Sequence, residues 1–135
     1  MSSDAMRTIT PAGWPAARGY SYAVEQGGRV QLAGVVGWDP VTQEIVPGGF
    51  AAQWAQVWAN MAEVLAAAGT TPDRVTSIRV YVTSLEAYHG ARKELGAGWG
   101  ATFGDHLPAI TLVEVSGLVL PDALLEAEAE AFLPR

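Results

Sequence analysis

Apolar residues recur every three or four positions between residues 50 and 68. This spacing is that of one face of an α-helix, so the segment is predicted to be helical. Gly69 follows it as a C-terminal cap. We interpret the stripe as core packing and assign no cofactor role to its tryptophans. The stripe consists of Phe50, Trp54, Val57, Trp58, Met61, Val64, Leu65 and Ala68.

Other segments alternate between apolar and polar residues, which is the pattern of β-strands. Residues 20–24 and 29–34 flank a Gly-Gly pair at 27–28, and together they predict a β-hairpin. Residues 74–83 alternate strictly, with their apolar side chains on one face. Residues 108–116 are rich in β-forming residues and predict another strand.

Turn residues separate these elements. Ser84 can cap a second helix, which is expected to fray or stop in the glycine-rich residues 96–100. Residues 35–49 are rich in Gly and Pro and predict a loop with at most a short extended piece. Residues 1–16 contain two prolines and a glycine and are predicted to be irregular.

Residues 123–132, with the sequence ALLEAEAEAF, leave two interpretations open. Ala, Leu and Glu favour a helix, but a helix would set Glu126 and Glu130 one turn apart as a like-charge pair. A strand would place Glu126, Glu128 and Glu130 on one face and three alanines on the other. The alternation favours the strand, whose alanine face would let the tryptophan-rich helix lie close to the sheet.

These elements predict a single α+β domain over residues 1–135, a mixed sheet with two helices packed on one face. Half of the residues are hydrophobic, which is enough for a modest core. Ca²⁺ takes six to eight oxygens, and the flat strand face that carries these three carboxylates rarely supplies them. We therefore expect no metal and no cofactor.

Charge and composition exclude several function classes. Eight Lys and Arg against fourteen Asp and Glu give a net charge of −6, which argues against nucleic acids and anionic membranes as partners. The absence of cysteine excludes disulfides, thiolate metal sites and a cysteine nucleophile. The first residues lack a signal peptide's apolar region, and no apolar run is long enough for a membrane span. A soluble cytoplasmic protein is expected.

Several blocks of the sequence resemble the RidA (YjgF) family. GYSYAVEQGGRVQLAG is similar to the family's PYSQAI…G…V..SG, and WDPVTQEIVPGGFAAQ to its LDP.TGEIV.G...AQ. VLAAAGTTPDRVTSIRVYVTSL is similar to VLEAAGSS..DVVK.TVYLTDM, FGDHLPAITLVEV to FG.H.PARSTVEV, and ALLEAEAEAF to ALVEIEAIAV. The likeness runs in order from about residue 18 to residue 133.

The resemblance implies a chorismate-mutase-like fold and a homotrimer that binds small molecules in clefts between neighbouring subunits. The segment of the three glutamates corresponds to a β-strand in that family. Its glutamate face would point toward neighbouring subunits, and Arg29 and Arg79 are candidate partners, because clustered carboxylates need opposite charges or raised pKa values.

Typical members of the family hydrolyse reactive enamines and imines and release ammonia. They clamp the substrate carboxylate with the Arg of PARS and use a Glu of the last strand to orient or activate water. In this chain Ile110 occupies the Arg position, so the chain resembles a member without the carboxylate clamp. The family's Ser-Gly pair is Ala33-Gly34 here, and both changes predict a more apolar cleft.

The resemblance implies Glu126 as the catalytic residue and Tyr20, Ala33, Gly34, Ile110 and Thr111 as substrate-binding residues. A carboxylate beside Ile110 would have a raised pKa, which suits general acid–base catalysis. Two plainer interpretations stay open: Glu126 as a structural charge and Tyr20 as a packing residue. The preferred function is a hydrolase acting on C=N or enamine bonds of an unusual substrate. The alternative is a non-catalytic ligand-binding or regulatory trimer, and a ribonuclease ranks third because the chain is acidic.

Overall fold

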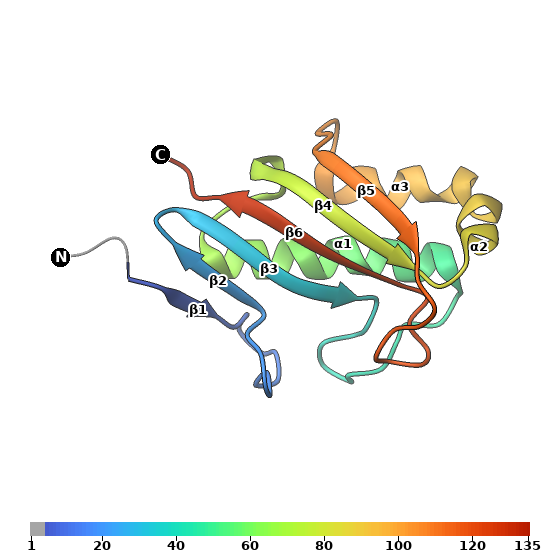
Figure 1. Cartoon of the computed structure of the whole chain (residues 1–135), viewed down its shortest axis with the longest axis horizontal. Helices are drawn as coiled ribbons and strands as arrows, with labels where there is room; N and C mark the ends of the chain where they lie inside the picture. The colour runs from blue at the N-terminus through green and yellow to red at the C-terminus, as the bar shows by residue number, and fades with distance from the viewer. Residues whose placement is uncertain (1–4) are drawn as a thin grey trace.

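The computed structural model describes residues 5–135, which form a mixed sheet with helices on one face (Figure 1). Within this range the sheet has six strands in the order β1-β2-β3-β6-β4-β5. Neighbouring strands are antiparallel, except that β4 and β5 are parallel. The elements are β1 (Arg7–Ile9), β2 (Ala23–Gln26), β3 (Arg29–Val36), α1 (Phe50–Ala68), a 3₁₀ turn (Pro72–Arg74), β4 (Val75–Val82), α2 (Leu85–Gly90), α3 (Arg92–Phe103), β5 (Ala109–Glu114) and β6 (Leu125–Phe132). The expected α+β class is confirmed.

The glutamate-rich segment is a strand, β6, in the middle of the sheet between β3 and β4. Its residues alternate between buried and half-buried along its length. Ala127, Ala129 and Ala131 are fully buried and face the helix layer, where α1 contacts β6. Packing therefore overrides the helical propensity of this segment, because only a strand buries its alanines and leaves its glutamates on the other face.

Helix α1 supplies the centre of the core. It has the predicted bounds, and Gly69 ends it in the left-handed conformation that favours glycine. Trp58 is fully buried and makes edge-to-face contacts with Trp54 and Trp99, both at 5.1 Å between ring centroids. Within residues 5–135 the indole N–H groups of these tryptophans have no oxygen or nitrogen acceptor. Edge-to-face rings allow weak N–H contacts to a π face instead. None of the helices described is long and apolar enough to cross a membrane.

The second predicted helix is interrupted and longer than expected. It breaks at Ala91 into α2 and α3, and α3 continues through the glycines to Phe103. Gly98 explains why a glycine is suitable inside this helix. A Cβ added to Gly98 would lie 2.9 Å from the Cβ of Ala55, so α3 and α1 pack too closely for a side chain there. The prediction of a helix end near 96–100 was wrong because close packing outweighs the local cost of glycine.

The N-terminal segment also differs from the prediction. Arg7–Ile9 forms β1, which pairs with β2, so the segment 1–16 is not irregular throughout. Arg7 ties this short strand to the core, since its Nε donates to Glu25 at 2.5 Å and its Nη2 donates to the Ala68 carbonyl at 3.2 Å. These are long-range contacts, which local turn signals do not reveal. Residues 1–4 lie outside the described residues.

Candidate functional site

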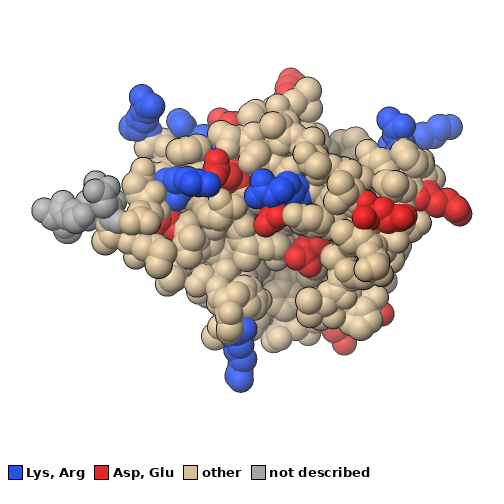
Figure 2. Space-filling model, in the orientation of Figure 1, with Lys and Arg blue, Asp and Glu red and all other residues tan. Residues whose placement is uncertain are grey.

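The sheet face opposite the helices carries a cluster of charged side chains. Figure 2 shows acidic and basic groups side by side over the middle of this face. The carboxylates come from β6, and the guanidinium groups come from its two neighbours, Arg29 on β3 and Arg79 on β4. Strand pairing brings these residues together although they lie far apart in the sequence.

Glu128 is held by two donors from β4. Arg79 Nε donates to Glu128 Oε1 at 3.0 Å, and the Tyr81 hydroxyl donates to the same oxygen. The hydrogen bond from Tyr81, followed by the contacts with Arg79, lowers the pKa of Glu128. Glu128 is therefore a structural anion that remains charged at neutral pH.

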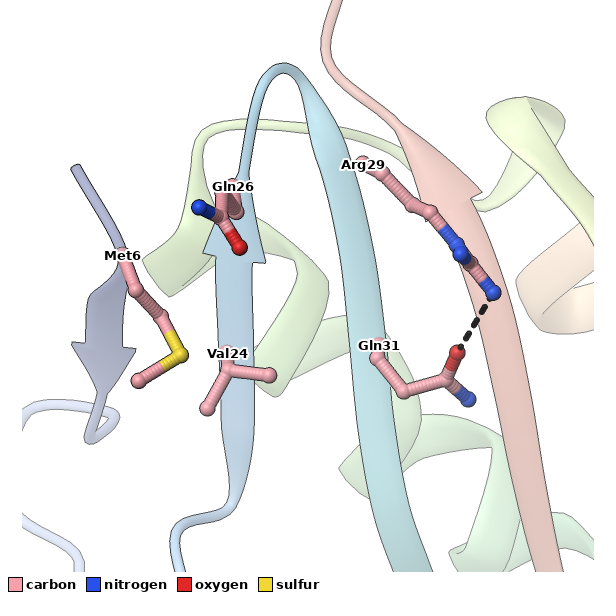
Figure 3. Close-up of a pocket in the computed structure, with 5 residues that line it drawn as sticks. All are labelled: Met6, Val24, Gln26, Arg29 and Gln31. Carbon is pink, nitrogen blue, oxygen red and sulfur yellow. Dashed lines mark hydrogen bonds between the residues drawn. The ribbon is translucent and has the colours of Figure 1, made fainter. Parts of the chain in front are cut away.

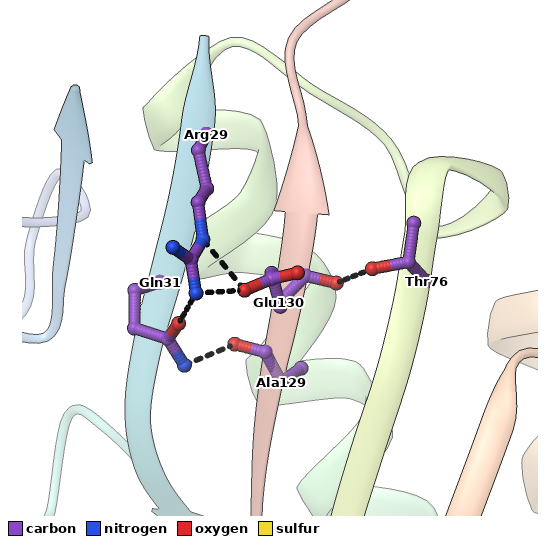
Figure 4. A network of polar contacts seen from close by, with 5 residues as sticks. All are labelled: Arg29, Gln31, Thr76, Ala129 and Glu130. Atoms are coloured by element: carbon purple, nitrogen blue, oxygen red, sulfur yellow. Dashed lines mark hydrogen bonds and ion pairs between the residues drawn. The ribbon is translucent and has the colours of Figure 1, made fainter. Parts of the chain in front are cut away.

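Glu130 belongs to a second network, at the other end of β6 (Figure 4). Arg29 Nε donates to Glu130 Oε2 at 2.6 Å, while Gln31 Nε2 donates to the Ala129 carbonyl at 3.2 Å. Thr76 Oγ1 donates to the Glu130 carbonyl at 3.2 Å. The two arginines thus pair with glutamates of β6, as the sequence predicted.

Glu126 differs from its two neighbours. Within residues 5–135 it has no ion-pair or hydrogen-bond partner, although its side chain is half-buried. Burial, and secondarily the negative charge of Glu128, raise the pKa of Glu126. A carboxyl group with a raised pKa can both accept and donate a proton, which suits acid–base chemistry.

Gly34 lies directly against this carboxylate. The register between β3 and β6 shifts between Leu32 and Val35, so Ala33 and Gly34 both occupy an irregular stretch of the strand. A Cβ added to Gly34 would stand 2.0 Å from Glu126 Oε2. The glycine therefore makes the space that the carboxylate fills, and the structure brings these two predicted site residues together.

Ala33 and Tyr20 lie near the same end of β3. The Ala33 N–H donates to the Tyr22 carbonyl at 2.9 Å, which extends the β2–β3 pairing beyond Ala23. Tyr20 precedes β2, is more than half exposed and contacts the Tyr22 ring edge-on at 5.6 Å. Because the two strands are antiparallel, Tyr20 lies toward the Gly34 end of β3 rather than the hairpin end.

Ile110 and Thr111 lie on β5, separated from β6 by β4. Ile110 pairs with Ile78, which is buried under the helices, and therefore faces the helix side. Thr111 pairs with Arg79 and faces the charged side. Within one chain Ile110 and Glu126 thus lie on opposite faces of the sheet. The expectation that Ile110 raises the pKa of Glu126 is wrong within the chain, since burial and Glu128 raise it.

Ile110 instead borders a cavity of about 280 Å³ on the helix side. This cavity cannot be predicted from local sequence patterns, because its wall combines residues of α1, α2, α3, β4 and β5. A weak signal was present, since Ile110 and Leu112 are two positions apart and must share a face. The lining residues are Trp54, Trp58, Val80, Tyr88, Trp99, Leu107, Ile110 and Leu112.

A second hollow, of about 300 Å³, lies on the charged face near β1 (Figure 3). Met6, Val24, Gln26, Arg29 and Gln31 line it. The guanidinium of Arg29 turns toward Glu130 and Gln31, so it serves the network of Figure 4. Within the described residues, no group of three or more acidic or histidine side chains is placed to hold a metal ion.

Comparisons with known proteins agree with this architecture. The family described as Endoribonuclease L-PSP matches residues 11–133. A RutC family protein of Pyrococcus horikoshii is 34% identical over 113 residues, which cover 84% of this chain and 86% of the relative. The 2-iminobutanoate/2-iminopropanoate deaminase of Mus musculus is 32% identical over 119 residues, which cover 87% of this chain and 85% of the relative.

The crystal structure of RidA from the Antarctic bacterium Psychrobacter is similar in fold and in sequence. It has a TM-score of 0.81 and 31% identity, covering 94% of this chain and 99% of that one. The family match, over residues 11–133, spans nearly the whole chain. The chain therefore belongs to the RidA (YjgF) family.

Proposed function

We propose that this protein is an imine or enamine hydrolase that releases ammonia and that Glu126 handles the attacking water. One observation carries the proposal. Glu126 is a half-buried carboxylate without a partner in residues 5–135, it has a raised pKa, and it is held against Gly34. The name of the mouse relative, 2-iminobutanoate/2-iminopropanoate deaminase, supports the reaction class.

The reaction needs one group that accepts and returns a proton. The Glu126 carboxylate accepts a proton from water as the water oxygen bonds to the imine carbon, and the C=N electrons move to nitrogen, to which Glu126 returns this proton. Glu126 then takes the proton of the new hydroxyl group and delivers it to the nitrogen, so the C–N bond breaks, ammonia leaves and the oxygen becomes a carbonyl. The balance is one imine and one water giving one carbonyl compound and one ammonia. A carboxyl group with a raised pKa is suited to both transfers.

We also propose that the substrate lacks the carboxylate of the simple 2-imino acids. Ile110 stands where the family resemblance places an arginine, and an isoleucine offers no charge-assisted hydrogen bond to an anion. Its side chain instead borders an apolar cavity. Ala33, Gly34, Tyr20 and Thr111 would then shape the remainder of the substrate site.

The proposed site lies between subunits of a homotrimer. Ile110 and Glu126 face opposite sides of one sheet, so a second copy is needed to bring such residues to one substrate. Strand β5 supports this arrangement, since five of its six residues are exposed in the single chain. Light scattering coupled to size exclusion should give three times the mass of the chain. The mass of one chain would contradict the proposed intersubunit site.

Ammonia release tests the hydrolase proposal. Freshly generated imines, with and without a carboxylate, would be mixed with the protein, and ammonia would be followed above the spontaneous rate. The wild type should accelerate release from at least one imine. Glu126→Gln should reduce that acceleration by roughly 10²-fold or more, the usual contribution of general acid–base catalysis. Glu130→Gln is the matched control, because its carboxylate serves the Arg29 network.

Two outcomes would contradict the proposal. Equal rates for the wild type and Glu126→Gln would remove Glu126 from the reaction. No acceleration with any imine would favour a trimer that binds a ligand without catalysis.

A further inference from the structure

The cavity beside Ile110 is lined by aromatic rings from three helices and by aliphatic side chains from two strands and the loop before β5. Trp54 and Trp58 come from α1, Trp99 comes from α3, and Val80 and Leu112 come from β4 and β5. Every lining residue is aromatic or aliphatic, and the Tyr88 hydroxyl is the polar group among their side chains apart from the indole N–H groups. The cavity wall therefore carries no formal charge.

Two pairs of tryptophan rings in this wall are arranged edge to face. Trp54 and Trp58 meet at an interplanar angle of 89°, and Trp58 and Trp99 meet at 80°. Trp54 also lies 6.0 Å from Tyr88, with the two rings tilted by 45°. An aryl ring entering such a wall can continue the same pattern, which is favourable beyond the apolar area that it buries.

Size and access agree with a small aryl group. A volume of about 280 Å³ exceeds the roughly 150 Å³ that suffices for benzene in an engineered apolar cavity. Leu107 is 79% exposed and Ile110 is 46% exposed, whereas Trp58 is fully buried at the base. The cavity thus has an apolar rim that opens at the β5 edge.

The position of Trp99 depends on the close packing of α3 on α1. Gly98 lets the two helices approach, since a Cβ there would collide with Ala55. Trp99 then stacks on Phe103 with ring centroids 4.0 Å apart. This fixed indole forms one side of the cavity, so the wall is formed before any ligand enters.

We propose that this cavity binds an uncharged aryl group and that the substrates are aryl-substituted imines without a carboxylate. The inference rests on the proposed function for the reaction, but the cavity itself is tested by binding alone. Hydrolysis of an aryl ketimine with water gives the aryl ketone and ammonia, so the ketone keeps the aryl group. Acetophenone, the simplest aryl methyl ketone, is therefore a stable probe for the cavity.

Binding is measured on the ¹⁵N-labelled full-length protein through the indole N–H signals of its five tryptophans. Acetophenone should shift the signals of Trp54, Trp58 and Trp99, which line the cavity. The signals of Trp14 and Trp38 serve as internal controls, since these residues lie outside it. Acetone, which lacks the ring, and benzoate, which carries a charge, should each bind at least about tenfold more weakly.

Two charged variants sharpen the assignment. Ile110→Arg places a cation at the rim and should weaken acetophenone binding at least about tenfold, because the aryl group would compete with a hydrated charge. Val119→Arg is the matched control, since Val119 is 95% exposed on the loop before β6 and outside the lining.

The outcomes separate this inference from the proposed function. Acetophenone binding at the three tryptophans without ammonia release from aryl imines would uphold the cavity and contradict the hydrolase. Release from alkyl imines without acetophenone binding would uphold the hydrolase and overturn the aryl cavity. Equal shifts at all five indoles, or unchanged binding by Ile110→Arg, would likewise overturn it.

Discussion

The carboxylate of Glu126 occupies the place where a side chain of residue 34 would begin. A Cβ at Gly34 would stand 2.0 Å from Glu126 Oε2 and 2.7 Å from its Cδ. The absent side chain on β3 thus sets the position of an unpaired carboxylate on β6. Neither residue achieves this alone, because the irregular register between the two strands aligns them.

Gly34→Ala should therefore displace the Glu126 carboxylate. We expect imine hydrolysis to fall by about tenfold or more, since small misplacements of a catalytic group are costly. The fold should persist, because Gly34 is exposed and has an ordinary backbone conformation. Circular dichroism and ammonia release measure the two effects. Gly96→Ala is the control, with open space around its added methyl group, and activity equal to wild type in Gly34→Ala would contradict the assignment.

The pH dependence of hydrolysis should follow the raised pKa of Glu126. The carboxylate form accepts the proton from water, so activity should be lost as the pH falls through that pKa. The acidic limb should accordingly lie above the pKa of an ordinary glutamate, about 4.3. Glu128→Gln should move the limb to lower pH, because it removes the negative charge that raises the pKa of Glu126. An acidic limb at the same pH in Glu128→Gln and in the wild type would argue against an effect of Glu128 on the pKa of Glu126.

Glu126→Gln should stabilise the protein at neutral pH. The pKa of Glu126 is higher in the folded than in the unfolded chain, so folding favours the protonated form. Its contribution to stability is present below the unfolded pKa and is lost as the pH rises through the folded one. The variant should therefore unfold at a higher temperature than the wild type at pH 7. The difference between the two unfolding temperatures should become smaller as the pH is lowered. Thermal unfolding measured at several pH values checks this prediction. A variant that is less stable than the wild type at pH 7 would contradict it.

Two glycines of α3 should respond in opposite directions to alanine. Gly98→Ala collides with Ala55 on α1 and should cost about 1–3 kcal/mol of unfolding free energy, as overpacked sites do. Gly96→Ala meets open space and should gain about 0.5–1 kcal/mol from helix propensity. Denaturant titrations compare the pair directly. Similar effects at both positions would show that α3 does not pack on α1 through Gly98.

Ile110→Arg tests whether the residue at position 110 decides if the substrate carries a carboxylate. An arginine at this position offers a bidentate contact to a carboxylate. We expect the variant to gain hydrolysis of carboxylate-bearing 2-imino acids by about tenfold or more, which corresponds to about 1.4 kcal/mol. Ammonia release from such imines measures the gain. Ile110→Met is the control, since methionine is uncharged and similar in volume to isoleucine, and it should show no gain. A gain in both variants would show that the charge of the arginine is not the cause.

Local periodicity in the sequence determined much of the secondary structure of this protein. The stripe from Phe50 to Ala68 predicted α1, and the alternation of residues 74–83 and 123–132 predicted one central strand and favoured another, together with the faces that they bury. The sequence blocks also indicated the family. The positive charges of Arg29 and Arg79 indicated that these residues are partners of the negatively charged glutamates. These properties depend on spacing within one segment or on charge, both of which a sequence displays directly.

Tertiary structure alone decided the rest. The strand β1, the break at Ala91 and the continuation of α3 past Gly98 all depend on contacts with distant segments. The contact of Gly34 with Glu126 depends on a register shift, and the side on which Ile110 lies depends on its pairing with β4. A sequence specifies which residues share a face of their own strand, but strand register and neighbouring elements decide what that face meets, because those are set by packing of the whole chain.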